Sequence, residues 1–224
     1  MPAKTKIPAK RVLIVDDHPM MRTGLAQLID NEPDLHVWAE ADNAGQALDA
    51  VARQPFDLIL LDISLPDKNG LELIKDIQTL KPGLPILVVS MHDELLYAER
   101  VLRAGGRGYI MKQEGGKKFL QAIRQVLSGQ VYVSEKMSAQ ILENVSGRHS
   151  EASASPIERL TDREFEVFQL IGQGKGTRDI AARLRLSVKT VEVHRANIKK
   201  KLKLKTATDL VGHAIRWLEA GQKG

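Results

Sequence analysis

The sequence contains no cysteine and no apolar run long enough to cross a bilayer. Without cysteine there is neither a disulfide nor a thiolate metal site. A membrane-spanning helix needs about 18 or more consecutive apolar residues, and no such run is present. The first ten residues are basic and lack the apolar centre of a secretory signal. These absences predict a cytoplasmic protein without a membrane partner.

Two nucleotide-binding signatures are missing as well. No Gly-x-Gly-x-x-Gly follows the first strand-like run, and no glycine-rich loop ends in Gly-Lys-Ser or Gly-Lys-Thr. Both motifs provide backbone amides for phosphates, so their absence argues against dinucleotide binding and P-loop nucleotide binding.

Charge is divided unevenly along the chain of 224 residues. Residues 159–224 contain 15 Lys and Arg against 7 Asp and Glu, a net charge of +8, whereas residues 1–158 contain 18 and 21, a net charge of −3. A basic C-terminal part behind a slightly acidic N-terminal part indicates that a polyanion binds the C-terminal part.

Residues 11 to about 129 alternate between strand and helix patterns. Short apolar runs at 12–15, 36–39, 58–61, 86–89 and 108–111 predict strands, and the patterns at 19–29, 44–53, 71–80, 94–104 and 117–127 predict helices. Such alternation is typical of a doubly wound α/β fold, here a five-stranded parallel sheet with helices on both faces.

Carboxylates follow two of the predicted strands. Asp16 and Asp17 come after the first, and Asp62 comes after the third. Ligands of such sheets bind at the carboxyl ends of the strands, so all three are expected at one edge if the two strands are neighbours. Carboxylates that close repel one another, and a hard cation such as Mg2+ relieves the repulsion through oxygen ligands. His18 comes next, and we interpret it as an ordinary loop residue because no second histidine lies at helical spacing.

Two later strands add other chemistry at the same edge. The fourth predicted strand ends at Ser90, whose side chain is a hydroxyl, and the fifth has Tyr109 and Lys112 near its end. A phosphoryl group on Asp62 would complete this cluster, because Asp62 can act as a carboxylate nucleophile. Lys112 and the metal would then neutralise phosphoryl oxygens, while Ser90 donates a hydrogen bond.

The ordered set resembles the receiver domain of bacterial two-component response regulators. The residues that carry the resemblance are Asp16-Asp17, Asp62 with Pro66 and Gly70, Ser90, Tyr109 and Lys112. The resemblance implies that a sensor histidine kinase phosphorylates Asp62. It also implies that Asp17, Asp62 and the backbone carbonyl of Ser64 bind Mg2+ or another divalent cation, with Asp16 acting through water. Ser90 and Tyr109 would form the switch pair.

Residues 159–224 predict an all-α domain of four helices. Thr161 and Glu164 form a capping-box pattern at the first helix, and Thr177 and Ser187 are expected to cap the second and third, at 178–184 and 188–201. The last helix is expected at 207–220. A short helix, a tight turn and a longer basic helix are typical of a helix-turn-helix.

Candidate DNA contacts lie on the third of these helices. Residues that project away from its apolar stripe are candidates for the major groove: Lys189, Glu192, Val193, Ala196 and Asn197. Others are expected to hold phosphates: Thr190, Arg195, Lys199, Lys200 and Lys203. The carboxylate of Glu192 either accepts a hydrogen bond from cytosine N4 or weakens phosphate contact.

This segment resembles the LuxR-type helix-turn-helix. The matching residues are Leu160-Thr161-Asp162-Arg163-Glu164, Asp179-Ile180-Ala181, Thr190-Val191, His194, Ile198 and Lys201-Leu202. With the receiver pattern in front, the chain resembles a NarL/FixJ-type response regulator. The resemblance implies a transcription regulator rather than an enzyme, which forms a homodimer through its last helix on phosphorylation and binds double-stranded DNA sequence-specifically.

The expected organisation is an N-terminal extension at 1–10, a receiver domain at 11–130, a linker at 131–158 and the DNA-binding domain at 159–224. The linker includes a possible short helix at 135–145 and a polar run of small residues at 146–155, which is typical of a flexible connector. Two alternatives stay open: an aspartyl-phosphate hydrolase that uses the same acid cluster, and a module whose C-terminal helices bind a protein rather than DNA.

Overall fold

The computed structural model describes residues 8–145, 156–184 and 186–221. Contacts divide the chain into two units, Met1–Ile141 and Leu142–Gly224, and each is described by itself. The division falls within α6 (Glu135–Val145), inside the expected 131–158 linker. The expected flexible run at 146–155 and most of the N-terminal extension lie outside the described residues. No helix in the described ranges combines the length and the apolar character needed to cross a membrane.

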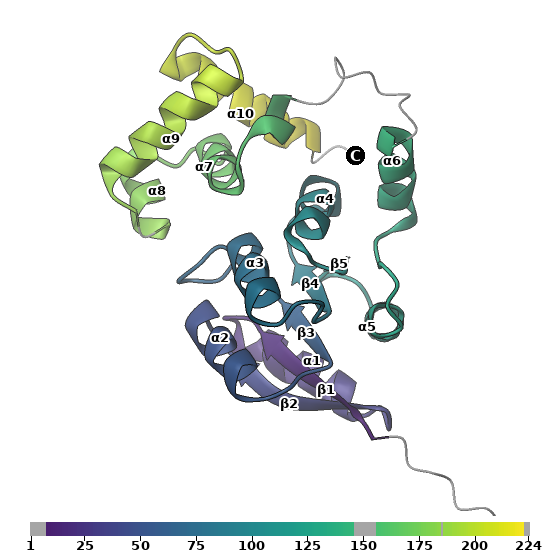
Figure 1. Cartoon of the computed structure of the whole chain (residues 1–224). Helices are drawn as coiled ribbons and strands as arrows, with labels where there is room; N and C mark the ends of the chain where they lie inside the picture. The colour runs from purple at the N-terminus through teal and green to yellow at the C-terminus, as the bar shows by residue number, and fades with distance from the viewer. Residues whose placement is uncertain (1–7, 146–155, 185, 222–224) are drawn as a thin grey trace, which may run out of the picture. The chain divides into compact units, whose positions relative to one another are not determined.

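The N-terminal unit is built on five parallel strands, as predicted (Figure 1). The strands are β1 (Lys10–Val15), β2 (Leu35–Ala41), β3 (Leu58–Leu61), β4 (Ile86–Ser90) and β5 (Gly108–Met111). Their order in the sheet is β2-β1-β3-β4-β5, so β1 and β3 are neighbours. All four residues of β3 are buried, which is the expected pattern for a strand covered on both faces.

Helices cover both faces of this sheet (Figure 1). On one face α1 (Pro19–Asp30) and α5 (Gly116–Leu127) bury a core cluster against the strands. The other face carries α2 (Ala44–Arg53), α3 (Gly70–Leu80) and α4 (Glu94–Ala104). The side chains of Asn43, Asn69 and Asp93 cap these three helices by accepting backbone N–H bonds. The doubly wound prediction is therefore confirmed.

After α5 the chain returns along the outer edge of β5. The Tyr109 amide donates to the Tyr132 carbonyl at 2.9 Å, and the Tyr132 amide donates to the Arg107 carbonyl at 3.1 Å. Two residues later, the Ser134 amide donates to Oε1 of Glu94 at 2.8 Å. The segment that leads into α6 is thus attached both to β5 and to the first turn of α4.

The C-terminal unit is all helical, as predicted, with α7 (Asp162–Gly172), α8 (Thr177–Arg183), α9 (Val188–Lys201) and α10 (Ala207–Gly221). A 3-10 turn, η1 (Pro156–Arg159), comes before them. The rings of Phe165 and Phe168 each lie 5.5 Å from the Trp217 ring, centroid to centroid, at interplanar angles of 84° and 62°. Aromatic edge-to-face contacts of this kind fix α7 against α10.

Two of the three predicted caps in this unit are confirmed. Thr161 and Glu164 form the capping box of α7, and the Ser187 side chain accepts the Thr190 amide at the start of α9. The cap predicted at Thr177 is wrong. Gly176 is the N-cap and Thr177 is the first residue of α8, because the Asp179 carboxylate reaches back and accepts the Gly176 amide at 3.3 Å.

Candidate functional site

The carboxyl ends of β1 and β3 lie side by side and bring two carboxylates together. Val15 and Leu61 are register partners, so Asp16 and Asp62 leave the sheet at the same level. The Asp62 amide donates to the Val15 carbonyl at 2.8 Å, which fixes this arrangement. Asp16 is 1% exposed and Asp62 3% exposed. The sequence argument expected this convergence on the condition that the two strands are neighbours, and that condition holds.

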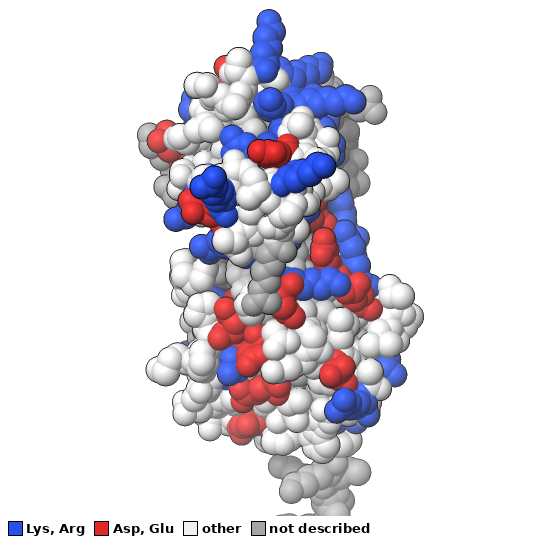
Figure 2. Space-filling view, turned by 90° about the vertical axis from the view of Figure 1, so that its left-hand side faces the viewer, with Lys and Arg blue, Asp and Glu red and all other residues white. Residues whose placement is uncertain are grey.

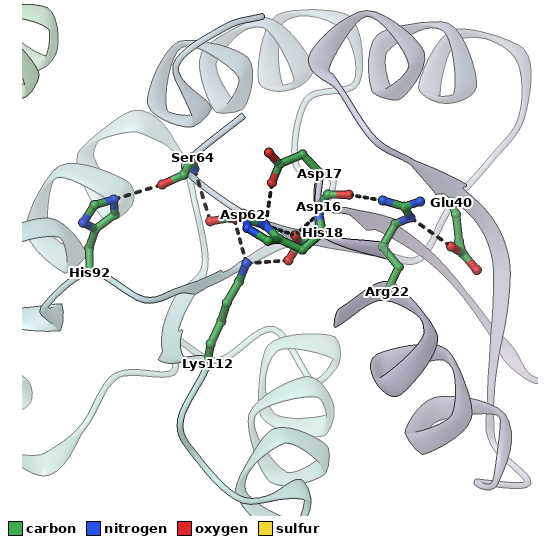
Figure 3. Close-up of polar contacts among 9 residues, drawn as sticks. All are labelled: Asp16, Asp17, His18, Arg22, Glu40, Asp62, Ser64, His92 and Lys112. Atoms are coloured by element: carbon green, nitrogen blue, oxygen red, sulfur yellow. Dashed lines mark hydrogen bonds and ion pairs between the residues drawn. The ribbon is translucent and has the colours of Figure 1, made fainter. Parts of the chain in front are cut away.

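Lys112, just beyond β5, ties these two carboxylates together (Figure 3). Its Nζ lies 2.7 Å from Oδ2 of Asp62 and 2.6 Å from Oδ2 of Asp16, and only 7% of its side chain is exposed. Burial by itself lowers the pKa of the Lys112 ammonium, but the two carboxylates outweigh burial and the pKa is raised. The Lys112 side chain is therefore fully charged where it contacts Asp16 and Asp62.

His18 also belongs to this cluster, which the sequence interpretation missed. Its Nδ1 lies 2.7 Å from Oδ1 of Asp17 and 3.2 Å from Oδ1 of Asp16, and its amide donates to Asp16. The search for a second histidine at helical spacing was the wrong test, because the partners of His18 are the carboxylates immediately before it. Asp16, Asp17, His18 and Asp62 offer ligand atoms that all lie within 4.8 Å of one another.

The donor set of the cluster fits a divalent cation. Oδ2 of Asp16 and Oδ1 of Asp17 are buried and accept no hydrogen bond from any residue that the structure describes. Their close contacts with Lys112 and His18 are ion pairs. Buried carboxylate oxygens with unused lone pairs are what a hard, oxygen-seeking cation requires. Three carboxylates also leave more negative charge than Lys112 alone can neutralise.

The loop after β3 contributes Ser64, which faces the cluster and a second histidine. The Ser64 amide donates to Oδ1 of Asp62 at 3.1 Å, and the Ser64 hydroxyl lies 2.9 Å from Nε2 of His92 (Figure 3). The sequence argument did not single out His92. Its only sequence signal is its place two residues after Ser90, at the end of β4.

Ser90 and Tyr109 are both buried, and both contact His92 rather than the carboxylates. Oγ of Ser90 accepts the His92 amide at 3.1 Å, while the Tyr109 hydroxyl donates to the His92 carbonyl at 2.8 Å. Burial raises the pKa of the Tyr109 hydroxyl, which keeps it protonated and able to donate. The two expected switch residues are therefore linked through the backbone of one residue.

In the C-terminal unit, α9 presents a continuous exposed face that we call the outer stripe. Its members recur at helical spacing, and all are exposed: Val188, Lys189, Glu192, Val193, Ala196, Asn197 and Lys200. The opposite face buries Val191 and Ile198. All five residues expected to reach the major groove lie on the outer stripe. Lys and Arg side chains gather over this unit in Figure 2.

The residues expected to hold phosphates flank the outer stripe or extend it. Arg195 and Lys199 are half-buried, and Lys203 is exposed just beyond the helix. Thr190 is also half-buried, and its hydroxyl lies 2.7 Å from the Ser187 hydroxyl, so it helps to cap α9.

Comparisons with known proteins agree with this geometry. Residues 12–124 match the model of the response regulator receiver domain, and residues 158–214 match that of the bacterial regulatory proteins of the luxR family. The oxygen regulatory protein NreC of Staphylococcus haemolyticus is 36% identical over 210 residues, which cover 92% of this chain and 97% of that relative. This chain belongs to the two-component response regulators. Its receiver and LuxR-type domains make it a DNA-binding transcription factor of the NarL/FixJ type, not an enzyme.

Solved structures of response regulators share the fold. A LuxR-family regulator from an Aurantimonas species is 31% identical, with a TM-score of 0.57, over 62% of this chain and 99% of that one. Salmonella enterica RcsB, bound to promoter rprA in the presence of the phosphomimetic BeF3−, has a TM-score of 0.65 at 23% identity and covers 92% of this chain and 98% of that one. At that identity the second likeness concerns the fold alone.

One lysine of the regulator's basic helix does not face outward. Nζ of Lys201 lies 2.6 Å from Oε2 of Glu164, the residue that also closes the capping box of α7. Burial alone raises the pKa of the Glu164 carboxyl, but the hydrogen bonds from Lys201 and Thr161 outweigh burial and the pKa is lowered. The Lys201 side chain therefore joins α9 to α7.

Proposed function

We propose that a sensor histidine kinase phosphorylates Asp62 and that this modification controls DNA binding by the regulator. The observation that carries the proposal is the position of Asp62 in one cluster with Asp16, Asp17 and Lys112, whose ammonium lies 2.7 Å from Oδ2 of Asp62. A phosphoryl group on Asp62 would add about −1.5 to −2 charges. Lys112 is already charged and in place, so it stabilises that added charge without reorganisation.

The same cluster would hold the metal that this chemistry needs. Asp17, Asp62 and the backbone carbonyl of Ser64 would bind Mg2+ directly, and Asp16 would bind it through water. The unused oxygens of Asp16 and Asp17 support this assignment. When bound, Mg2+ supplies electrostatic neutralisation of phosphoryl oxygens. His18 positions Asp17 and Asp16 through its short contacts with both carboxylates.

Ser90 and Tyr109 would transmit the modification to the rest of the receiver. A hydroxyl can accept and donate at once, so Ser90 can donate to a phosphoryl oxygen on Asp62 while its Oγ accepts the His92 amide. Tyr109 holds the carbonyl of the same residue, so a shift at His92 changes the environment of its hydroxyl. A phosphorylation switch requires a bistable element, and the contacts of Ser90 and Tyr109 with His92 would be that element here.

The output would be a homodimer that binds paired DNA half-sites. Contacts through α10 would join two copies, and the outer stripe of α9 would enter the major groove, with half-sites about 10 bp apart. The net charge of +8 in residues 159–224 supports an electrostatic contribution from phosphates. The promoter complexes of RcsB with a phosphomimetic are in keeping with this output.

The first test is phosphoryl uptake from a small phosphodonor with Mg2+, with oligomeric state measured on the same samples. Wild type should take up phosphoryl and shift to a dimer, whereas Asp62→Asn should do neither. Asp49→Asn, which alters an exposed carboxylate on α2, is the matched control and should behave as wild type. Label retained in Asp62→Asn would refute the assignment, and steady turnover of a phosphate ester would revive a hydrolase.

A second test addresses the DNA interface. Phosphorylated protein should bind duplex DNA with an affinity that falls steeply as salt rises, and Lys200→Ala should reduce the slope of log K against log salt by about 1. We propose that the receiver spans residues 11–130, the linker 131–158 and the DNA-binding domain 159–224. A fragment of residues 159–224 should therefore bind the same duplex. Affinity that does not depend on salt would favour a protein partner for the C-terminal helices.

A further inference from the structure

Glu192 is an unusual member of the outer stripe, because it places a carboxylate on a surface that otherwise carries cations and uncharged side chains. It is exposed. Among the described residues no ion pair or hydrogen bond of its side chain is present, although Lys189 and Arg195 lie three residues away on either side. A carboxylate without an intramolecular cation is repelled by phosphates, so it lowers affinity for DNA in general. When α9 enters the major groove, this carboxylate loses water and needs a hydrogen-bond donor in its place.

The major groove offers such donors only on bases. Cytosine presents the N4 amino group, whereas adenine presents N6 next to the acceptor N7, which would repel a carboxylate. Guanine presents two acceptors and thymine one acceptor with a methyl group. A carboxylate held at the groove floor therefore favours cytosine over the other three bases.

The neighbours of Glu192 on the outer stripe fit this arrangement. Val193 is 52% exposed and lies at the centre of the stripe, opposite the buried Val191 and Ile198. An apolar branched side chain in that position matches the methyl group of a thymine. Ala196, one turn after Glu192, carries only a methyl group and is exposed, so it leaves room for a base pair to approach the helix.

We propose that Glu192 is a specificity-determining residue that accepts a hydrogen bond from N4 of a cytosine in each half-site, and that Val193 contacts the methyl group of a neighbouring thymine. The inference rests on the proposed entry of α9 into the major groove. It adds the chemical identity of two of the base pairs that the regulator reads.

The experiment is selection from random duplexes by phosphorylated full-length protein, followed by affinity measurements on the selected site and its single-base variants. Wild type should select a cytosine at one position of each half-site. Glu192→Ala should lose about tenfold discrimination for cytosine at that position alone, and its affinity for random DNA should rise because a repulsive charge is removed. Glu192→Gln should shift the preference toward adenine, since an amide pairs with both N6 and N7.

Two controls separate base reading from charge and folding. Asp49→Asn removes an exposed carboxylate of α2, outside the DNA-binding domain, so it should leave every base preference unchanged. Replacing the selected thymine by uracil removes its methyl group and should weaken wild-type binding about fourfold. That replacement should have no effect on Val193→Ala.

The possible failures are distinct. Sequence-selective binding in which Glu192→Ala retains every base preference would overturn this inference and leave the DNA-binding proposal standing. If wild type selects no sequence and Lys200→Ala does not alter the salt slope, the proposed interface itself fails. A thymine-to-uracil change that affects wild type and Val193→Ala equally would overturn the assignment of Val193.

Discussion

Replacing Lys112 by methionine removes the ammonium that contacts Asp16 and Asp62 and keeps most of the side-chain volume. In the wild type this ammonium contacts Asp16 at 2.6 Å and Asp62 at 2.7 Å, and all three side chains are at most 7% exposed. Removing one partner of a buried ion pair costs about 3–5 kcal/mol, because the remaining charges stay buried without compensation. For a receiver of this size, that corresponds to a fall in melting temperature of roughly 10–20 °C.

The assay is thermal unfolding by calorimetry in EDTA, so that no divalent cation replaces the lost charge. Asp16→Asn in the Lys112→Met background removes one of the repelling carboxylates. The double variant should be at least about 1 kcal/mol more stable to unfolding than the sum of the two single substitutions predicts, because residues in contact are energetically coupled. Adding Mg2+ should stabilise Lys112→Met more than wild type. A variant that melts within about 2 °C of wild type in EDTA would refute the argument that Lys112 compensates these carboxylates.

Three further predictions follow from other contacts. Mg2+ at a hundred times its dissociation constant should stabilise the wild-type receiver by about 2.7 kcal/mol, and Asp17→Asn should lose most of that gain in a thermal shift assay. The pKa of Glu164 is lowered in the folded state, so the Glu164 carboxylate should stabilise the fold above the unfolded pKa near 4.3, and this stabilisation should be lost as pH falls through the folded pKa. Urea titrations of residues 159–224 should show this loss in wild type but not in Glu164→Gln. That variant should also be about 1–3 kcal/mol less stable than wild type at pH 7. Gly70→Ala should destabilise the receiver in urea titrations, because a Cβ there would lie 2.6 Å from the Ile63 Cα, and an equal stability of the two proteins would contradict this.

The regular elements followed from local sequence patterns. The bounds of β3 and α9 agree with the predicted 58–61 and 188–201. Apolar runs and capping residues act within a few positions, so the sequence carries their signal directly. The alignment of Asp16 with Asp62 needed one further condition, the adjacency of β1 and β3, which is a property of doubly wound sheets rather than of either strand.

The contacts that escaped prediction join residues that are far apart in the sequence. The Ser64 hydroxyl meets His92 across 28 positions, and Lys201 meets Glu164 across 37. Neither pair leaves a periodic signal, because each depends on how a loop or a helix end is turned toward its neighbour. The lysines at 199–201 look alike in the sequence, but Lys201 pairs with Glu164 of α7 whereas Lys200 is exposed.

One short segment between α5 and α6 is attached to the receiver at two places. Tyr132 pairs with the backbone of β5 beside Tyr109, and the amide of Ser134 is held by the buried Glu94 at the start of α4. Because α4 begins two residues after His92, a displacement at His92 reaches Glu94 within half a helical turn. The chain that leads to α6 is therefore anchored to the two elements that a switch at Ser90 and Tyr109 would move, and it is the only covalent route to α9.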